Sequence, residues 1–459
     1  MNKSVMLALS LTPAALFADP TVERVIVRQQ WPWSTDVKVE YSLSGVDANN
    51  PADISVRAFN GESEISSANL DAAITGERYG VTSAVGSFMI DPIAAFGTSQ
   101  IALGNFSVQL SVSGSSASMV EPLYKIIRIA DGDCTDVSKA DILNGKYGSY
   151  ETDYRKIYST YTNLADVIIW TGVTNNVAYK TTHIVMRKIK CKDIQWTMGE
   201  PDTLPYHNAG SPQCQVVLTN NFWIGVFPVT VGQWKSADPN TKGRTVSNGV
   251  YPENTNECVA TSSSIKHFRA GSTTATHTFP QTKHSVSSDS LCGKLRALTG
   301  YDFELPTEAQ WEFAAHGGVY SQSLYTGEEP TTDPELLEAT KRVAWFNSNS
   351  KSGSYYYWHP VGSLNPNAYG LYDMLGSVAE VMRNRFYTYD TEHVTYEPEG
   401  GDDGVVVWRS YTLYNGFSGQ RPGTRLRDVS GELQNNAYRG ARLILPDTPG
   451  LVYPDFEKP

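Results

Sequence analysis

One irregular stretch, Pro360–Val381, constrains the fold of this chain more than any other. It mixes glycine, proline and asparagine, which favour turns, with apolar side chains that favour a core. This composition is typical of a buried loop. Because every peptide group taken out of water needs a partner, we expect either a bound cation or a fixed tertiary frame to hold the loop.

A second stretch, Leu305–Ala315, predicts a helix with a defined start. Thr307 and Gln310 have the spacing of a capping box, in which two side chains satisfy the first free amides of a helix. Thr230 and Gln233 repeat that spacing earlier in the chain. We interpret both helices as scaffold.

Both stretches resemble the formylglycine-generating enzyme (sulfatase-modifying factor) family. Pro360–Val381 is similar to the family's order P-V-G, P-N, G-L-Y-D-M and G-N-V-W-E-W, with departures at Ser377, Ala379 and Val381. Leu305–Ala315 is close to the family's L-P-T-E-A-E-W-E-Y-A-A. The resemblance implies a mixed α/β domain over residues 183–446, related to C-type lectins and rich in irregular structure. Residues 447–459 would then form a C-terminal tail.

The chain before this domain divides into three parts. Residues 1–18 have the layout of a signal peptide: Lys3, an apolar run over Val5–Phe17, and Ala18 as the cleavage residue. A buried N-terminal helix is the alternative. Residues 19–130 alternate polar and apolar side chains, as in Asp36–Tyr41, which predicts an antiparallel β-sandwich. Residues 131–182 form a connecting segment, so the predicted fold class is α+β.

Charge and hydropathy limit the partners and the location. The net charge of -11 argues against a nucleic-acid partner and favours a cationic or neutral ligand. No stretch after the signal is long and apolar enough for a transmembrane segment. We therefore expect an exported protein that is periplasmic, secreted or surface-associated.

The cysteines bear on both stability and activity. In an exported protein, five cysteines predict one or two disulfides and a buried thiol. Catalytic members that the chain resembles use two cysteines in the C-terminal third to bind copper(I), because thiolates are soft ligands. No cysteine follows Cys292 in this sequence, so copper is not expected.

Two functional hypotheses follow. The first is a non-catalytic module that binds a glycan or an exported protein or peptide, supported by aromatic residues such as Trp408 and Tyr411. The alternative is a divergent enzyme acting in oxidative maturation of sulfatases or of another exported protein, with Arg409, Tyr411, Arg439 or Arg442 in its site. These five residues together are the candidate ligand cleft.

The resemblance also implies a candidate calcium site. In G-N-V-W-E-W, the Asn and Glu side chains and a backbone carbonyl are similar to the hard oxygen ligands that Ca²⁺ prefers. The matching positions in this chain are Ser377, Val378 and Glu380. The alternative is that Glu380 only accepts hydrogen bonds from the loop.

Overall fold

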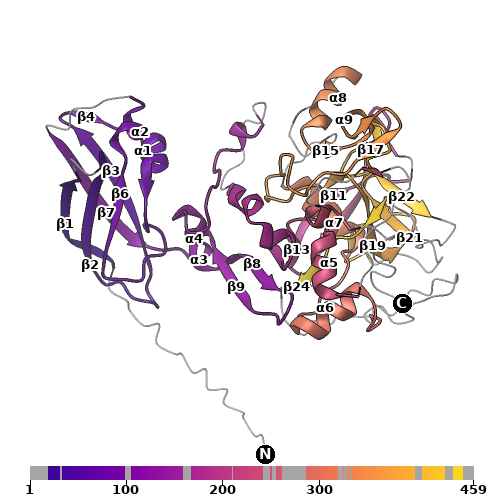
Figure 1. The fold of residues 1–459 in the computed structure, drawn as a ribbon, viewed down its shortest axis with the longest axis horizontal. Helices are drawn as coiled ribbons and strands as arrows, with labels where there is room; N and C mark the ends of the chain where they lie inside the picture. Colours follow the sequence, from indigo (N-terminus) through magenta and orange to yellow (C-terminus); the bar gives the residue numbers. More distant parts are fainter. Residues whose placement is uncertain are drawn as a thin grey trace, which may run out of the picture. The chain divides into compact units, whose positions relative to one another are not determined.

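The computed structural model describes residues 19–30, 34–98, 105–158, 167–208, 210–240, 249–250, 255–260, 286–318, 324, 328, 330, 332–398, 406–428 and 438–447. The predicted signal peptide over 1–18 and nearly all of the predicted tail over 447–459 lie outside these residues. The described chain divides into two compact units (Figure 1). The first comprises residues up to Glu121 together with Ser138–Lys146, and the second comprises Pro122–Val137 and the residues from Tyr147 onward.

The first unit is the predicted antiparallel β-sandwich. One sheet has the strand order β1-β2-β6-β5 and the other β4-β3-β7, and the strands within each sheet pair antiparallel. Its elements are β1 (Thr21–Gln29), β2 (Val37–Ser44), β3 (Ala52–Asn60), β4 (Ser63–Glu64), α1 (Ser67–Ala73), β5 (Ile74–Thr75), β6 (Val85–Ile90), α2 (Pro92–Phe96), β7 (Phe106–Gly114), α3 (Ala117–Val120) and α4 (Lys139–Leu143).

The alternating sequence pattern explains the core of this sandwich. Successive side chains of a strand point to opposite faces, and in β2 the buried positions are Val37, Val39, Tyr41 and Leu43. These residues belong to one apolar cluster with side chains from the other sheet, including Ile54 of β3. The period of two therefore buries one face of each sheet.

A five-stranded sheet with the order β24-β13-β10-β8-β9 runs through the second unit. It brings together strands that are far apart in the sequence: β8 (Pro122–Arg128), β9 (Cys134–Ser138), β10 (His183–Ile189), β13 (Phe222–Gly225) and β24 (Ile444–Pro446). Strand β8 pairs antiparallel with β10, from Tyr124 opposite Arg187 to Arg128 opposite His183. The second unit thus includes a strand that precedes the boundary expected at residue 130.

The other elements of the second unit are short. Its remaining sheets have the orders β11-β12-β20, β14-β17-β16, β15-β18 and β22-β21-β19-β23. The strands are β11 (Ile194–Met198), β12 (Cys214–Leu218), β14 (Gly249–Val250), β15 (Ala344–Trp345), β16 (Lys351–Ser352), β17 (Tyr355–Tyr357), β18 (Leu375–Gly376), β19 (Ala379–Arg385), β20 (Thr395–Tyr396), β21 (Val406–Arg409), β22 (Arg425–Asp428) and β23 (Arg439–Gly440). The helices are α5 (Val231–Ala237), α6 (Leu291–Thr299), α7 (Glu308–His316), α8 (Asp333–Lys341) and α9 (Asn347–Ser350). Single 3-10 turns occur at η1 (Tyr154–Lys156), η2 (Thr171–Asn175), η3 (Val177–Lys180), η4 (Thr255–Glu257) and η5 (Phe417–Gly419).

Both predicted capping boxes are confirmed. The Thr307 side chain accepts from the backbone N–H of Gln310 while the Gln310 side chain accepts from that of Thr307, and α7 starts at the next residue. Thr230 and Gln233 do the same for α5. These reciprocal bonds satisfy amides that would otherwise be buried without partners.

The expected disulfides do not form. All five cysteines lie in the described part of the chain, and each is a thiol, four of them buried: Cys191, Cys214, Cys258 and Cys292. They pack as small apolar side chains, which is common for buried cysteine. In the described ranges, we find no helix with the length and hydropathy needed to cross a membrane.

Candidate functional site

The Pro360–Val381 loop is held by side chains of the protein itself. Asn367 is fully buried; its amide donates to the carbonyls of Ala314 and Ala315 at 2.7 and 3.1 Å, and its oxygen accepts from the backbone N–H of Leu371 at 3.1 Å. The Asp373 carboxylate accepts from the backbone N–H of Gly362 at 2.7 Å. A fixed tertiary frame therefore supplies these partners, which was one of the two expectations.

A buried ion pair joins Glu380, near the C-terminal end of this loop, to Arg442. Arg442 and Glu380 are almost completely buried, with 3.1 Å between the Arg442 Nη2 and Glu380 Oε1 atoms. The Arg442 guanidinium also donates to the carbonyls of Gly225, Val226 and Tyr372 at 2.7–2.9 Å. One side chain thus joins the loop to the segment that follows β13.

At the candidate calcium site, the Glu380 carboxylate is engaged by donors of the protein itself. It already accepts from Arg442 and, at 2.6 Å, from the indole N–H of Trp311. The Ser377 carbonyl accepts from the backbone N–H of Leu413. A cation at Glu380 would lie beside the Arg442 guanidinium, which would repel it. The geometry favours the alternative, in which Glu380 accepts hydrogen bonds.

Asp373 gives a pH-dependent prediction. Burial raises the pKa of Asp373 to about 6, above its ordinary 3.8. A carboxyl whose pKa is raised in the folded state loses its stabilising contribution as pH rises from the unfolded to the folded pKa, here between about 4 and 6. Two pH units correspond to roughly 3 kcal/mol. Asp373→Asn keeps an oxygen for the Gly362 N–H and removes the charge, so it is expected to be more stable than wild type at pH 7.5.

Urea unfolding at pH 7.5 and pH 4.5 tests this prediction. The gain from Asp373→Asn should be of order 2–3 kcal/mol at pH 7.5 and clearly smaller at pH 4.5, where the wild-type carboxyl is largely protonated in the folded state. An equal change at the two pH values would contradict it.

A second buried cluster joins helix α7 to strands β21 and β22. Arg409 lies 2.7 Å from Glu312 and 3.2 Å from Glu308, measured between guanidinium nitrogen and carboxylate oxygen, and Arg425 lies 2.6 Å from Glu308. All four side chains are nearly or completely buried. Burial alone would raise the pKa of Glu312, but Arg409 and His316 hold that pKa below its ordinary value. The Glu312 carboxylate is therefore charged and paired.

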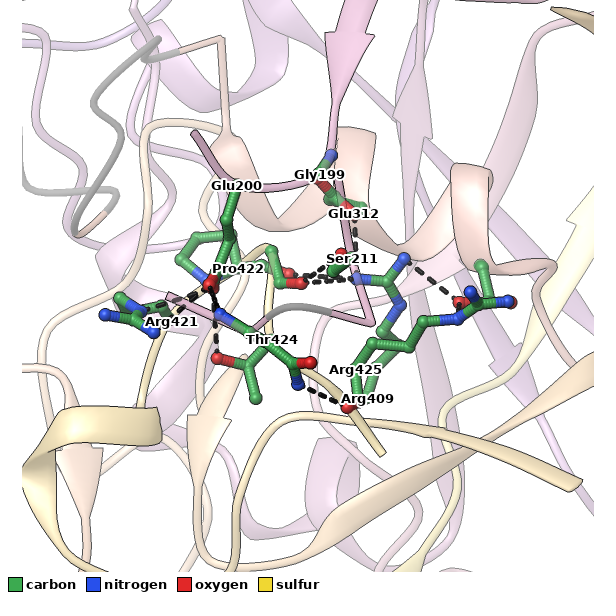
Figure 2. Close-up of polar contacts among 12 residues, drawn as sticks. Gly199, Glu200, Ser211, Glu312, Arg409, Arg421, Pro422, Thr424 and Arg425 are labelled. Atoms are coloured by element: carbon green, nitrogen blue, oxygen red, sulfur yellow. Dashed lines mark hydrogen bonds and ion pairs between the residues drawn. The ribbon is translucent and has the colours of Figure 1, made fainter. Parts of the chain in front are cut away.

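Figure 2 shows Glu312, Arg409 and Arg425 of this cluster beside a further ion pair. The Arg421 guanidinium lies 3.1 Å from the Glu200 carboxylate, which also accepts from Thr424 at 3.2 Å. Glu312 in turn accepts from the backbone N–H of Gly199 at 2.6 Å. The carboxylates and guanidinium groups of this cluster are paired with one another inside the core, so we assign them to structure.

A cavity of about 330 Å³ lies against the β22-β21-β19-β23 sheet. We call it the sheet pocket. Tyr414 is packed between two other rings, with centroid distances of 3.8 Å to Tyr356 and 3.8 Å to Tyr438. The Arg439 guanidinium lies over the Trp408 ring at 4.7 Å. The pocket is lined by Ala379, Trp408, Thr412, Tyr414, Asn415, Leu426, Arg427, Tyr438 and Arg439.

The structure separates the five candidate cleft residues. Trp408 and Arg439 line the sheet pocket. Arg409 and Arg442 do not, because both are fully buried in the ion pairs described above. Tyr411 packs its ring closely against the Gly419 backbone and is not among the residues lining the pocket. Adjacent residues of a strand point to opposite faces. In β21 the Trp408 side chain therefore lies on the face with the sheet pocket, and the Arg409 side chain lies on the face with the buried ion pairs.

Six further pocket residues were not among the candidate cleft residues: Thr412, Tyr414, Asn415, Leu426, Arg427 and Tyr438. They lie in the same C-terminal segment as the candidate cleft residues. The antiparallel pairing of β22 with β21, which places Leu426 opposite Trp408, brings several of these residues together. That pairing is not readable from the separate segments.

Comparisons with known proteins agree with the sequence motifs. Residues 195–437 match the sulfatase-modifying factor enzyme 1-like domain. The chain is 33% identical over 117 residues to the formylglycine-generating enzyme of Streptomyces coelicolor, covering 25% of this chain and 37% of that protein. It is 28% identical over 211 residues to the serine/threonine-protein kinase pkn1 of Chlamydia pneumoniae, covering 45% and 29%.

Two further matches are a relative whose name describes it as inactive and a solved structure. The inactive C-alpha-formylglycine-generating enzyme 2 of Mus musculus is 33% identical over 109 residues, covering 23% of this chain and 31% of that protein. Among solved structures, Treponema denticola variable protein 1 is 20% identical with a TM-score of 0.43, covering 58% of this chain and 96% of that one. The chain spans between 29% and 37% of the length of these three curated relatives.

The matched family region covers more than half of the chain and contains the capping-box helix α7, the Pro360–Val381 loop and most of the residues lining the sheet pocket. The predicted α+β fold and the predicted family are both confirmed. The chain belongs to the family of sulfatase-modifying factor enzyme 1-like domains.

Proposed function

We propose that this chain is an exported, non-catalytic binding protein whose ligand occupies the sheet pocket. The composition of the pocket carries the proposal. Eight of its nine lining residues fall within 408–443, the segment where the catalytic members that the chain resembles carry their copper-binding cysteines. In this chain the segment supplies aromatic rings, an amide and two guanidinium groups. The layout of residues 1–18 supports export.

The cysteines that the chain does have are poorly suited to copper(I). The metal binds thiolates and displaces their protons, so a raised thiol pKa lowers the apparent affinity for copper(I). Burial raises the pKa of Cys214 to about 12 and raises that of Cys191 further. Burial also raises the pKa of the half-buried Cys134. These shifts favour the neutral thiol.

Two more observations favour binding over catalysis. Arg409 and Arg442, which a divergent enzyme would use, are committed to Glu312 and Glu380. One relative is named as inactive, so a similar domain exists without the activity. Since the chain spans about a third of its curated relatives, their activities are not carried over to it.

Oxygen consumption tests the proposal. The purified protein is incubated with copper(I) and a cysteine-containing sulfatase peptide, with the Streptomyces coelicolor formylglycine-generating enzyme as positive control. We expect no tight copper binding and no peptide-dependent oxygen uptake. Uptake that depends on both peptide and copper would instead support the divergent-enzyme alternative.

A further inference from the structure

The β-sandwich of the first unit has a long edge strand, β7, with one unpaired side. Strand β7 pairs with β3 along its whole length, from Phe106 opposite Asn60 to Gly114 opposite Ala52, and it is the last strand of its sheet. Within the described residues, neither its backbone nor its side chains have a hydrogen-bond partner beyond that ladder. Because bonding directions alternate along an antiparallel strand, about half of its peptide groups point away from the sheet.

The edge strands of the two sheets differ in their sequences. Strand β1 carries Glu23, Arg24 and Arg28 and has a register shift after Val22. Charged side chains and bulges keep an edge strand from pairing with another chain. Strand β7 reads FSVQLSVSG, with no charged residue, no proline and an unbroken register against β3. Strand β1 comes close to β7, but no ladder joins the two in the part of the chain that the structure describes.

The apolar side of β7 is incompletely covered. Its inward side chains pack against the core of the sandwich but stay only half-buried: Phe106, Val108, Leu110 and Val112. In the neighbouring strand β3, by contrast, the inward side chain of Ile54 is fully buried. The positions between them in β7 are polar and exposed: Ser107, Gln109, Ser111 and Ser113. A strand added at this edge would cover part of the apolar side, and that burial is favourable.

The sequence of β7 is complementary to itself when two copies run antiparallel. Leu110 is its middle residue, so a two-fold axis there sets Val108 opposite Val112 of the second copy and Gln109 opposite Ser111. Every apolar residue then faces an apolar residue or glycine, and every polar residue faces a polar one. Such cross-strand pairs are what stabilises a sheet. Strand β1 lacks this symmetry, because the same operation would set its charged residues opposite apolar ones.

We infer that the protein forms a dimer in which the β7 strands of two copies pair antiparallel and join two β4-β3-β7 sheets into one. The inference concerns the first unit and does not depend on the ligand proposed for the sheet pocket. The interface is isologous, since the same edge serves both copies. A strand of 9 residues spans roughly 30 Å. One such edge buries less area than a standard interface, so we expect a weak dimer whose population rises with protein concentration.

Sedimentation velocity of the purified protein from about 1 to 100 µM tests the inference. Two double variants share Gln109→Glu and differ at residue 111. With Ser111→Glu, glutamate faces glutamate at two places in the interface, whereas with Ser111→Lys, glutamate faces lysine at both. We expect the first variant to raise the dissociation constant of the dimer about tenfold or more and the second to leave it unchanged or lower it.

The fold should tolerate both variants, because the two side chains are exposed and Gln109 lies opposite Arg57 within its own sheet. Thermal unfolding checks this. Ser63→Glu with Thr82→Glu is the matched control, since it adds the same charge as the first variant at exposed residues outside β7. The control should leave the dissociation constant unchanged.

Each outcome decides the inference. A dimer that the glutamate pair weakens and the glutamate–lysine pair retains supports it. A monomer at every concentration would overturn it and would leave the β7 edge to a strand of another protein. A dimer that the glutamate pair leaves intact would overturn it as well, because the interface would then lie elsewhere. Loss of the dimer in both variants would overturn the pairing centred on Leu110.

Discussion

Replacing Arg442 with methionine is expected to lower the free energy of unfolding by roughly 3–5 kcal/mol. The substitution leaves the Glu380 carboxylate buried with only the Trp311 N–H as a described donor. It also removes one donor from each of the Gly225, Val226 and Tyr372 carbonyls, of which Val226 keeps the backbone N–H of Tyr372 at 3.0 Å. Methionine fills much of the space, so the expected loss reflects unpaired polar groups rather than a cavity. Urea unfolding followed by circular dichroism measures it.

The matched control is Arg155→Met, because that side chain is 63% exposed and, among the described residues, its ion pair is with Asp153. It should change stability by less than about 1 kcal/mol. Arg442→Lys should not restore the wild-type value, since an ammonium group cannot reproduce the geometry of several donors fixed in one plane. A loss below about 1 kcal/mol for Arg442→Met would show that Glu380 and the three carbonyls find other partners.

Arg409→Met is expected to have a comparable effect, roughly 3–5 kcal/mol. Glu308 keeps Arg425 at 2.6 Å, but Glu312 loses its arginine and stays fully buried at the centre of helix α7. Tyr389, whose hydroxyl accepts from Arg409 at 2.7 Å, loses a donor as well. The cost should come mainly from the charge left on Glu312.

A double variant tests that explanation. Adding Glu312→Gln to Arg409→Met removes the stranded charge, so the double variant should be more stable than the single Arg409 variant by about 1 kcal/mol or more. The same glutamine change in the wild-type background should be destabilising, because it breaks a satisfied pair. If Glu312→Gln destabilised both backgrounds equally, the two residues would be energetically independent and the account of the cluster would be wrong.

The sequence was sufficient for local structure and family. Two capping boxes fixed the starts of α5 and α7 because their four-residue spacing is self-contained. The period of two predicted the antiparallel sandwich because one face of each sheet is buried. The ordered motifs around Pro360–Val381 identified the family.

The site could be predicted only in part, for a physical reason. Arginine at the surface and arginine in the core read the same in a sequence, and only the partners tell them apart. Glu312, 97 residues before Arg409 in the chain, decides that Arg409 is structural. The expected disulfides were wrong for a similar reason. A disulfide requires two cysteines that lie close together in the fold, and their spacing in the sequence does not give that distance.

We propose that this member of the family binds a ligand without oxidising a peptide. Peptide-dependent oxygen consumption in the presence of copper(I) tests it most directly, beside the active Streptomyces coelicolor enzyme. We expect oxygen uptake at the level of the protein-free control. Sustained uptake that requires the peptide cysteine would contradict it and would require a copper site built without the C-terminal cysteine pair.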